Sequence, residues 1–493
     1  MAIGPNLDIG RDLKLYVSTQ ASFDIATNGT TAGENYPVAG DAIRLITGSA
    51  GGAMPFATRE DKFATATYIG GIQQKMTAEA SLDTYLAVNG TAAQIPDIGP
   101  DLLAGGGWEL VDTRAISTTV ASNTDATVFV TTSATGFEEG GAVAVEDEDD
   151  EDLYHLRRIK TIAGTTITVE PPLPAAPSAA QKLRGCASYK PNDSRDGGNS
   201  DLTAQALTVF MGNNRSCDQV ESFFPTSFGF SLGGDSAARL SVSGTGKRTM
   251  RMMGTTAAEA VDATETAIDV ANAKIFEGLD NLAVPACYQI DDEVLKVESV
   301  AGDTITVAAR GSYAGGSGAV EHDSGTPIVP HMPTPTITGG PVPATSGSIY
   351  YCEYGDTSAT ALQMTTSTID CGFGVTTRDN VHGSTAVVAG YTMNIREVNL
   401  SMSGWTLYDS DFELQGDVMA GWYSNVGTGA TSQQCSVVVQ QGTELGSSVA
   451  LVAPRFRPTM ASLDRGAEEV TVEASGICEG TSSGADEILL IFS

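Results

Sequence analysis

The four histidines are the first residues to consider, because imidazole serves metal sites and acid–base catalysis alike. They are His155, His322, His331 and His382, and no two stand in the His-x-x-x-His or His-Glu-x-x-His spacing of a catalytic zinc site. No Gly-x-Ser-x-Gly elbow lies between a predicted strand and a helix, and no Gly-x-x-x-x-Gly-Lys-Ser/Thr phosphate loop is present. We assign no catalytic, cofactor-binding or metal-binding residue and expect the chain not to be an enzyme.

Two short segments have residue types that hold ions in other proteins. Seven consecutive carboxylates, Glu146 to Asp152, could bind Ca²⁺, but they lack the glycine-containing loop of an EF-hand, and runs of like charge are usually solvated turns. Gly244-Thr245-Gly246-Lys247-Arg248 is similar to a phosphate-binding loop, yet it follows a predicted strand and opens no helix. We interpret the first segment as a solvated tip and the second as a glycine turn.

The cysteines give no covalent framework. There are seven, at positions 186, 217, 287, 352, 371, 435 and 478, and none belongs to a close Cys-x-x-Cys pair. The odd number and the scatter predict neither a disulfide framework nor a structural zinc site. We expect each cysteine to fill a small buried or half-buried space.

The elements that must carry these residues are predicted to be short strands. Apolar residues make up 41% and charged residues 18% of 493, and 55 glycines punctuate the chain, which is typical of an all-β protein of two to four domains. One short helix is predicted at 97–104, ended by Gly105-Gly106-Gly107. The clearest hairpin joins 226–232 to 239–244 through Gly233-Gly234-Asp235. Further strands are expected at 14–18, 63–72, 73–85, 204–211, 365–377, 391–406, 412–423, 435–440, 448–452, 469–479 and 488–492.

Two stretches repeat one another about 140 residues apart, and each predicts a small β module. Asp125-Ala126-Thr127, Phe137-Glu138-Glu139-Gly140 and Ala163-Gly164-Thr165-Thr166-Ile167-Thr168-Val169 return as Asp262-Ala263-Thr264, Phe276-Glu277-Gly278 and Ala301-Gly302-Asp303-Thr304-Ile305-Thr306-Val307. We predict a larger body interrupted twice: body at 1–111, first module at 112–185, body at 186–253, second module at 254–333 and body at 334–493. The proline- and glycine-rich stretch 327–343 is expected to be an extended linker.

The charge balance limits the partners. Sixty Asp and Glu against 27 Lys and Arg give a net charge of −33 and a pI of about 4.3. Such a surface repels phosphate, and the small cluster of Lys247, Arg248 and Arg251 is not the basic patch that tight nucleic-acid binding requires. If the protein meets DNA, we expect it not to grip it; solubility or a salty habitat is the other explanation for the acidity. Aromatic residues, at 6%, are too sparse for stacking platforms that bind sugars or single strands.

Nothing in the sequence predicts a membrane partner. No stretch approaches the roughly 18 consecutive apolar residues of a membrane span. Residues 1–11 lack the basic and then apolar pattern of an export signal. We expect a soluble protein made in the cytosol.

Loose patterns of alternation over most of the chain carry a family resemblance. In the later part they are Thr368-Ile369-Asp370-Cys371-Gly372-Phe373-Gly374-Val375, Arg396 to Gly404, Phe412-Glu413-Leu414, and Leu451 to Phe456 followed by a strand from Glu469; in the earlier part they are the hairpin around Gly229-Phe230-Ser231-Leu232 and Leu240 to Gly244. These segments, 365–493 and 222–250, resemble the tail tube proteins of long-tailed bacteriophages. Ile290 to Val294, Arg310-Gly311 and His322 to Gly325 make the modules similar to small β domains common in phage structural proteins.

The resemblance implies a structural role. Tail tube subunits are β-sandwich-like or barrel-like bodies whose sheets join edge to edge into rings, and the stacked rings form a channel through which double-stranded DNA passes without tight binding. The implied partners are other copies of the chain, the tape measure protein and tail-end proteins, in the virion tail. A carboxylate-lined inner wall would suit the passage of DNA, although the acidic residues could also lie mostly outside.

The resemblance leaves the number of bodies open. About 335 residues lie outside the modules, which fits either two tandem tube domains in rings of three chains or one elaborated domain in rings of six. We expect the modules to project outward and their removal to leave assembly intact.

Other classes of protein remain as alternatives. A secreted or surface-layer adhesin built from β modules would also be acidic, but it should carry an export signal or Ca²⁺ sites. A capsid-decorating or tail-fibre protein is another possibility, although fibres usually carry heptad stretches and none is present.

Overall fold

The computed structural model describes residues 13–20, 36–53, 56–58, 71–73, 75–88, 95–192, 206–213, 215–233, 236–276, 286–311, 317–344, 346–362, 364–377, 391–393, 395–405, 434–464, 471–481 and 485–493. Strands account for nearly all regular structure in these residues, which confirms the predicted all-β class. No helix in these ranges is long and apolar enough to cross a membrane.

The body consists of two units with the same order of strands. The first unit contains β1 (Lys14–Thr19), β2 (Ala42–Ile43), β3 (Thr47–Ala53), β4 (Phe56–Thr58), β5 (Gly71–Gln73), β6 (Thr77–Tyr85), β16 (Leu207–Gly212), β17 (Ser216–Gly233), β18 (Ser236–Gly246) and β19 (Arg248–Met253). The second contains, in corresponding order, β27 (Gly347–Glu353), β28 (Thr360–Leu362), β29 (Met364–Gly372), β30 (Val375–Thr377), β31 (Tyr391–Met393), β32 (Glu397–Trp405), β33 (Cys435–Gln441), β34 (Val449–Asp464), β35 (Thr471–Cys478) and β36 (Leu489–Phe492).

The strand pairings of the first unit recur in the second. β1 pairs with β2 and β16, as β27 pairs with β28 and β33. The order β3-β6-β18-β17 matches β29-β32-β35-β34, and β4–β5 matches β30–β31. Even the irregularities coincide, because the ladder shifts register just after Pro225 in β17 and just after Pro458 in β34. The chain therefore contains a structural duplication.

Each unit is a sandwich of two layers with a shared apolar interior. In the first unit, Leu15 and Val209 of one layer are buried in one cluster with Leu82, Phe230 and Val242 of the other. β17 crosses between the layers: Ser216 to Glu221 pair with β19, and Ser227 to Gly233 pair with β18 and β29. β34 crosses in the same way, from β33 and β36 to β35. Long strands that change layer are a common way to turn the corner of a sandwich.

The two units are joined edge to edge. β17 of the first unit pairs antiparallel with β29 of the second, from Ser227 opposite Gly372 to Gly233 opposite Thr366. This contact makes one continuous eight-stranded sheet in the order β3-β6-β18-β17-β29-β32-β35-β34, which we call the central sheet.

The two modules share one strand order. β9 (Ser117–Asn123), β10 (Val128–Thr131), β11 (Ala142–Glu146), β12 (Tyr154–Ala163), β13 (Thr166–Glu170) and β14 (Lys182–Gly185) form a closed barrel. β20 (Thr255–Thr256), β21 (Ala267–Asp269), β22 (Ala286–Ile290), β23 (Glu293–Ala301), β24 (Thr304–Ala309) and β25 (Pro327–Pro330) follow the same order, with a bridge between Ala257 and Val270 at the remaining gap. The sequence repeat thus corresponds to a repeated fold.

Residues of the sequence repeat have the same local role in both modules. The carboxylates of Asp125 and Asp262 each accept hydrogen bonds from the amide and hydroxyl two residues later, at Thr127 and Thr264. Gly164 and Gly302 each have φ +65°, in the two-residue turns that join β12 to β13 and β23 to β24. A positive φ at this position explains why the repeat retains glycine.

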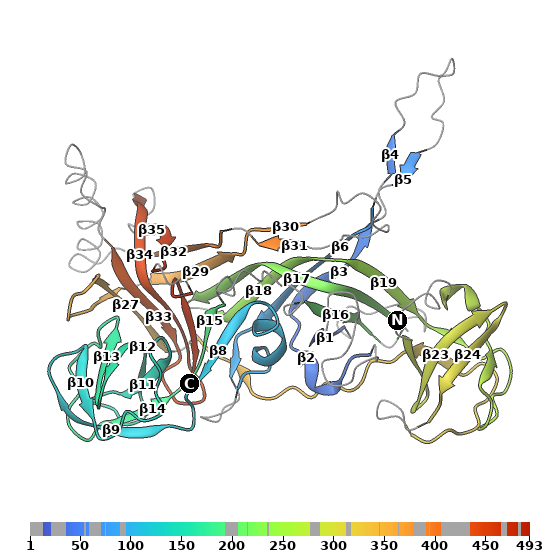
Figure 1. The fold of residues 1–493 in the computed structure, drawn as a ribbon, viewed down its shortest axis with the longest axis horizontal. Helices are drawn as coiled ribbons and strands as arrows, with labels where there is room; N and C mark the ends of the chain where they lie inside the picture. Colours follow the sequence, from blue (N-terminus) through green and yellow to red (C-terminus); the bar gives the residue numbers. More distant parts are fainter. Residues whose placement is uncertain are drawn as a thin grey trace, which may run out of the picture.

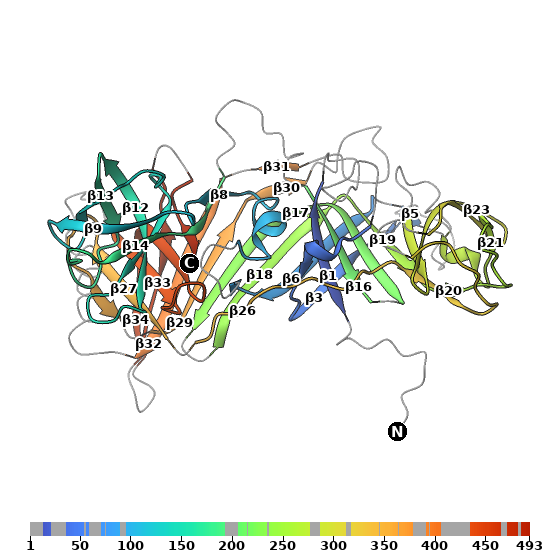
Figure 2. The same cartoon turned by 90° about the horizontal axis from the view of Figure 1, so that it is seen from below.

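The modules lie at opposite ends of the long axis, with the two-unit body between them (Figures 1 and 2). In the sequence, the second module follows the first unit and precedes the second unit, so only the first module interrupts a unit. It enters through β8 (Trp108–Asp112) and leaves through β15 (Ala187–Pro191), which pair with each other and extend the outer layer of the second unit beside β36.

Each module covers an apolar outer face of one unit. The first module, although it interrupts the first unit, packs on the second: Ala144 and Leu156 share a cluster with Val438, Val452 and Ile491. The second module packs on the first unit through a cluster that includes Tyr16, Phe210 and Met252. Tyr16 pairs opposite Phe210 as Tyr350 pairs opposite Val438, so the two modules occupy equivalent places.

Several predicted elements differ from the observed ones. The predicted helix 97–104 is the short η3 (Gly99–Leu103), which has i→i+5 hydrogen bonds such as Leu103 to Ile98. The strand predicted at 448–452 extends to Asp464, and the linker predicted at 327–343 begins as β25 and later forms β26 (Gly340–Pro341) against β7 (Ala87–Val88). The strand predicted at 412–423 and most of that at 63–72 lie outside the described residues.

Candidate assembly interface

The histidines that the structure describes are parts of separate packing contacts. His155 lies 2.7 Å from Asp147, and burial, together with the nearby charge of Arg157, lowers the pKa of His155 despite this carboxylate. His331 lies 3.2 Å from the side-chain oxygen of Gln289. His322 belongs to a buried clamp around Glu293, and His382 lies outside the described residues.

The clamp lies inside the second module and centres on Glu293, which is fully buried. Its carboxylate accepts hydrogen bonds from Arg310 Nε at 2.7 Å and from the amide of Val320, and it lies 2.9 Å from His322 Nε2. Burial raises the pKa of Glu293, but the hydrogen bonds from Arg310 and His322 outweigh it, so the net pKa lies below the usual value. Arg310 also donates to the carbonyl of Glu265, so the clamp ties together loops that are distant in sequence.

The acidic run Glu146 to Asp152 lies at the connection of β11 and β12. Lys182 binds Glu146 at 2.7 Å and His155 binds Asp147, whereas Glu148 to Glu151 are exposed. Within the residues described, no group of three or more His, Cys, Asp or Glu side chains is arranged to hold a metal ion.

Gly244 to Arg248 were interpreted as a glycine turn, and this was wrong. β18 continues through Gly246, because Gly244 lets the backbone of β18 approach β17 closely; a Cβ on Gly244 would clash with the carbonyl oxygen of Phe224. Arg248 forms an ion pair with the buried Glu221, and Arg251 pairs with Asp218 at 2.7 Å. The basic cluster is therefore largely neutralised within the strands.

All seven cysteines are buried and free of disulfides. Burial raises the pKa of Cys186 and of Cys371 to about 12. Reactive thiolates are accordingly scarce at neutral pH.

The two margins of the central sheet form a different kind of site. In the described part of the chain, β3 has a ladder partner on one side only, β6, and β34 from Met460 to Leu463 pairs only with β35. The seven residues of β3, Thr-Gly-Ser-Ala-Gly-Gly-Ala, include no charge and no proline. Charges and prolines are the usual protection of an edge strand against pairing, so this edge is suited to accept another strand.

The face of the central sheet opposite the sandwich interior carries mainly small polar side chains. Its exposed and half-exposed positions include Thr47, Ser49, Thr77, Ser81, Ser227, Ser231, Ser241, Ser243, Thr366, Thr368, Asn399, Ser401, Ser403 and Ser475. The charged side chains among these described positions are six carboxylates, Glu79, Asp83, Asp370, Glu397, Asp464 and Glu473, and two guanidinium groups, Arg239 and Arg457, of which Arg457 pairs with Glu479. The face is therefore hydroxyl-rich and net negative.

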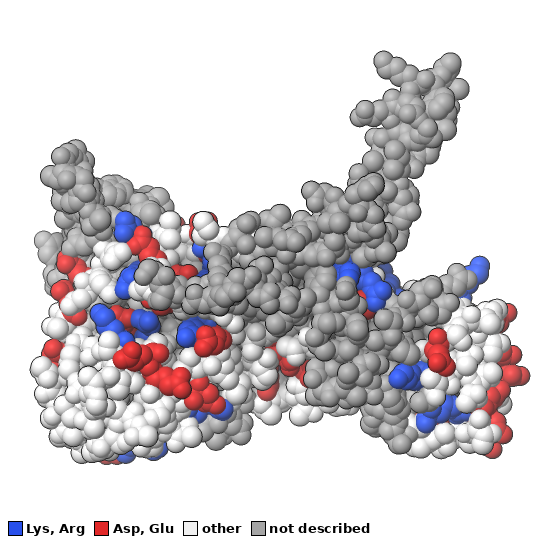
Figure 3. Space-filling model, viewed as in Figure 1, with Lys and Arg blue, Asp and Glu red and all other residues white. Residues whose placement is uncertain are grey.

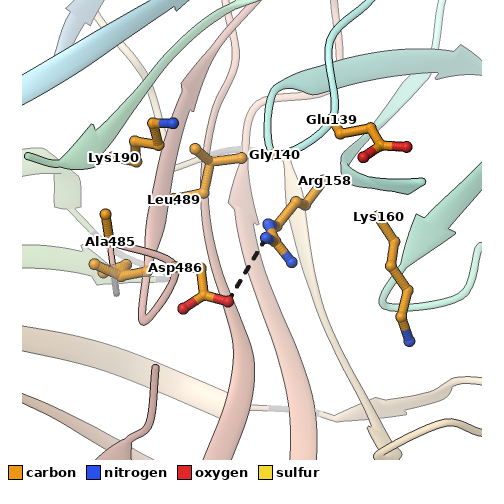
Figure 4. A pocket seen from close by; sticks show the side chains of 9 residues that line it. Glu139, Gly140, Arg158, Lys160, Lys190, Ala485, Asp486 and Leu489 are labelled. Carbon is orange, nitrogen blue, oxygen red and sulfur yellow. Dashed lines mark ion pairs between the residues drawn. The ribbon is translucent and has the colours of Figure 1, made fainter. Parts of the chain in front are cut away.

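Many of the other acidic residues lie on the modules, as the face drawn in Figure 3 illustrates at both ends of the molecule. A pocket of about 240 Å³ lies between the first module and the C-terminal residues (Figure 4). Arg158 in its wall forms an ion pair with Glu170 and approaches Asp486 at 4.0 Å, and Lys160 lies 3.3 Å from Glu170. The cations there are paired, so we interpret the pocket as an ion-paired seam.

Sequence reasoning left the duplication of the body open as one of two alternatives, although a signal that favours it was present. Phe223-Phe224-Pro225-Thr226 and Phe456-Arg457-Pro458-Thr459 occupy the same place in β17 and β34, and Ser243-Gly244 and Ser475-Gly476 occupy the same place in their partners β18 and β35. No protein-family model matches the chain, and a search of curated proteins found no match.

Proposed function

We propose that this chain is the ring-forming subunit of a tail tube of a long-tailed bacteriophage, with three copies in each ring. The rings stack, and the exposed face of the central sheet lines a channel for double-stranded DNA. The partners under this proposal are further copies of the chain, the tape measure protein and the proteins at the ends of the tail.

The observation that carries the proposal is the contact between β17 and β29. Two units of identical topology already join edge to edge within one chain, and the equivalent outer strands, β34 and β3, remain at the two margins of the central sheet. A heterologous contact of this kind produces rings or filaments when it is repeated. With two units per chain, three chains provide the six equivalent units of a pseudo-sixfold ring.

The exposed face of the central sheet fits the passage of DNA. The side chains of this face are mostly small and carry hydroxyl groups, and its six carboxylates outnumber its two arginines, so that it repels phosphate. Stable binding of duplex DNA depends on several cationic contacts that release counterions, and the described positions of this face provide only Arg239 and Arg457, the latter paired with Glu479. On this face hydroxyl groups outnumber carboxylates, whereas the sequence suggested a carboxylate-lined wall.

The test is to examine the purified protein by negative-stain microscopy and light scattering over a range of salt concentrations. We expect rings or tubes with a central hole wide enough for a DNA duplex, and a mass that is a multiple of three chains. A protein that stays monomeric under every condition would contradict the proposal. Retention of duplex DNA by wild-type tubes at physiological salt would contradict the role of the wall.

A further inference from the structure

The pairing of β17 with β29 between the two units of one chain predicts how two copies of the chain pair with each other. This inference rests on the proposed function. We infer that β34 of one copy pairs antiparallel with β3 of the next copy, in a register that places Ser462 opposite Gly51 and Leu463 opposite Ala50. The partner of both sheet margins is thus a second copy of this chain.

β34 and β17 can be aligned through their prolines. Pro225 and Pro458 each precede the bulge in their ladder, and Gly244 and Gly476 stand opposite these prolines in β18 and β35. Counting from the prolines, Gly229 corresponds to Ser462 and Phe230 to Leu463.

β3 and β29 can be aligned through the strands that separate them from β17 and β34, which are β6 and β18 in the first unit and β32 and β35 in the second. Gly244 lies opposite Ala80 of β6, and Ala80 lies opposite Ala50 of β3. In the second unit, Gly476 lies opposite Leu400 of β32, and Leu400 lies opposite Ile369 of β29. Ala50 therefore corresponds to Ile369, and Gly51 to Asp370.

The register observed between β17 and β29 gives the expected register between β34 and β3. In the contact between the units, Gly229 lies opposite Asp370 and Phe230 lies opposite Ile369. The corresponding residues at the margins are Ser462 with Gly51 and Leu463 with Ala50. A slip of one residue would move the apolar side chains of the strand to the other face of the sheet, so the register is strongly specified.

The local space agrees with this pairing. A Cβ added at Gly51 would have no atom within 4 Å, so a side chain can be introduced there without disturbing the sheet. The absence of charge and proline from β3 removes the features that normally prevent such an approach. Each copy then contributes one margin of each type, so the contact is head to tail and closes when the last copy meets the first.

Cysteine cross-linking tests the register. The variant Gly51→Cys with Ser462→Cys should form a disulfide between copies on mild oxidation, because directly opposed residues have Cβ atoms about 4.5–5.5 Å apart. On a non-reducing gel we expect dimers and trimers and no larger species. The native cysteines are buried, so the background from them should be low.

Three matched controls define the result. Ser49→Cys with Ser462→Cys shifts the pair by two residues, to a diagonal separation of about 7–8 Å, and should cross-link poorly. Gly229→Cys with Asp370→Cys should form the corresponding disulfide within one chain, because these residues are opposed in β17 and β29. Equal mixtures of the single variants Gly51→Cys and Ser462→Cys should give dimers and nothing larger.

The possible outcomes distinguish an error in the strand register from an error in the proposed function. Rings in the microscope without a Gly51–Ser462 cross-link, while the Gly229–Asp370 control oxidises, would overturn the pairing and leave the tube proposal standing. A stronger cross-link from Ser49 than from Gly51 would overturn the register. Failure of the wild-type protein to assemble at all would overturn both. A cross-linked ladder that continues past the trimer would overturn closure at three copies.

Discussion

At the residue scale, the two glycines that face the ladder bulges, Gly244 and Gly476, are positions where a larger residue does not fit. A Cβ at Gly476 would clash with the carbonyl oxygen of Arg457, as one at Gly244 would with that of Phe224. The atoms in the way belong to the backbone of the paired strand, which cannot swing aside as a flexible side chain can. The strand crossings that define both units therefore depend on these two residues.

We predict that Gly244→Ala and Gly476→Ala each destabilise the body by about 1–3 kcal/mol, the usual cost of forcing extra atoms into a packed site. Gly40→Ala is the matched control, since a Cβ there would have no atom within 4 Å. Thermal melting should show lower transition temperatures for the two strand variants. Equal melting of Gly244→Ala, Gly476→Ala and Gly40→Ala would show that the close approach is not limiting.

Glu293 gives a second prediction at the residue scale. Replacing one partner of a buried charge pair usually costs about 3–5 kcal/mol, so Glu293→Gln should loosen the second module markedly. Hydrogen exchange of residues 286–309 is the measurement. Glu259→Gln is the control, because Glu259 is exposed in the same module and should leave exchange unchanged.

The effect of Glu293 should depend on pH in a defined direction. Its pKa is lowered in the folded protein, so its stabilisation is fully present above the value of the unfolded chain, about 4.3, and is lost as the pH falls through the lower folded value. The difference in exchange between wild type and Glu293→Gln should be full at pH 7 and shrink in acid. A difference that grows on acidification would contradict the role assigned to the clamp.

At the element scale, the seating of the first module changes what its removal should do. The sequence suggested that either module could be removed without effect on assembly. In the structure, the first module covers Val438, Val452, Leu489 and Ile491 of the second unit, and Gln440 bonds to the backbone of Tyr154 and Leu156. Removing the module would expose this apolar face to water.

The deletion can be made cleanly because Asp112 of β8 lies opposite Ala187 of β15. Replacing 113–186 by Asn-Gly should close a two-residue hairpin. We predict that this variant aggregates or melts at lower temperature, and that adding Leu489→Thr and Ile491→Thr partly restores its solubility. A deletion variant as soluble and stable as the full chain would contradict the buttressing role of the module.

How far the elements could be predicted depended on the range of the interactions that form them. Alternation was sufficient for β18 and β35, where buried and exposed positions alternate, whereas β1 and β33 are buried on both faces. It failed for β34, which was expected to end at Val452 but continues through Pro454 and Pro458; a proline that lacks a donor is tolerated at a bulge or an edge, and Pro458 precedes a bulge.

The arrangement of the elements was beyond sequence reasoning. The first module interrupts one unit yet packs on the other, through contacts such as Leu156 with Gln440 that span 284 positions. No local pattern reports such a distant partner. The clamp was visible only as the segments around Glu293, Arg310 and His322, with no sign in the sequence that they converge.

At the scale of the whole molecule, we predict that the charge on the exposed face of the central sheet controls contact with DNA. Glu79→Lys, Glu397→Lys and Glu473→Lys together change three exposed positions of the central sheet. Tubes of this variant should hold duplex DNA in a salt-sensitive way, and the DNA should be protected from nuclease because it lies inside the channel.

The control for the wall variant changes the same number of charges on the modules, with Asp149→Lys, Glu259→Lys and Asp303→Lys, which are all exposed. Any DNA that these tubes bind should remain sensitive to nuclease because it lies outside. Equal protection by the two variants, or protection by the module variant alone, would show that the central sheet does not face the channel.

Cryo-electron microscopy of the assembled wild-type protein would show directly how the copies join. We expect rings of three chains in which β3 of each copy continues the sheet of its neighbour from β34, with the hydroxyl-rich face turned toward a central hole and both modules outside. A single particle with both sheet margins covered by its own chain, or a ring with that face turned outward, would contradict it.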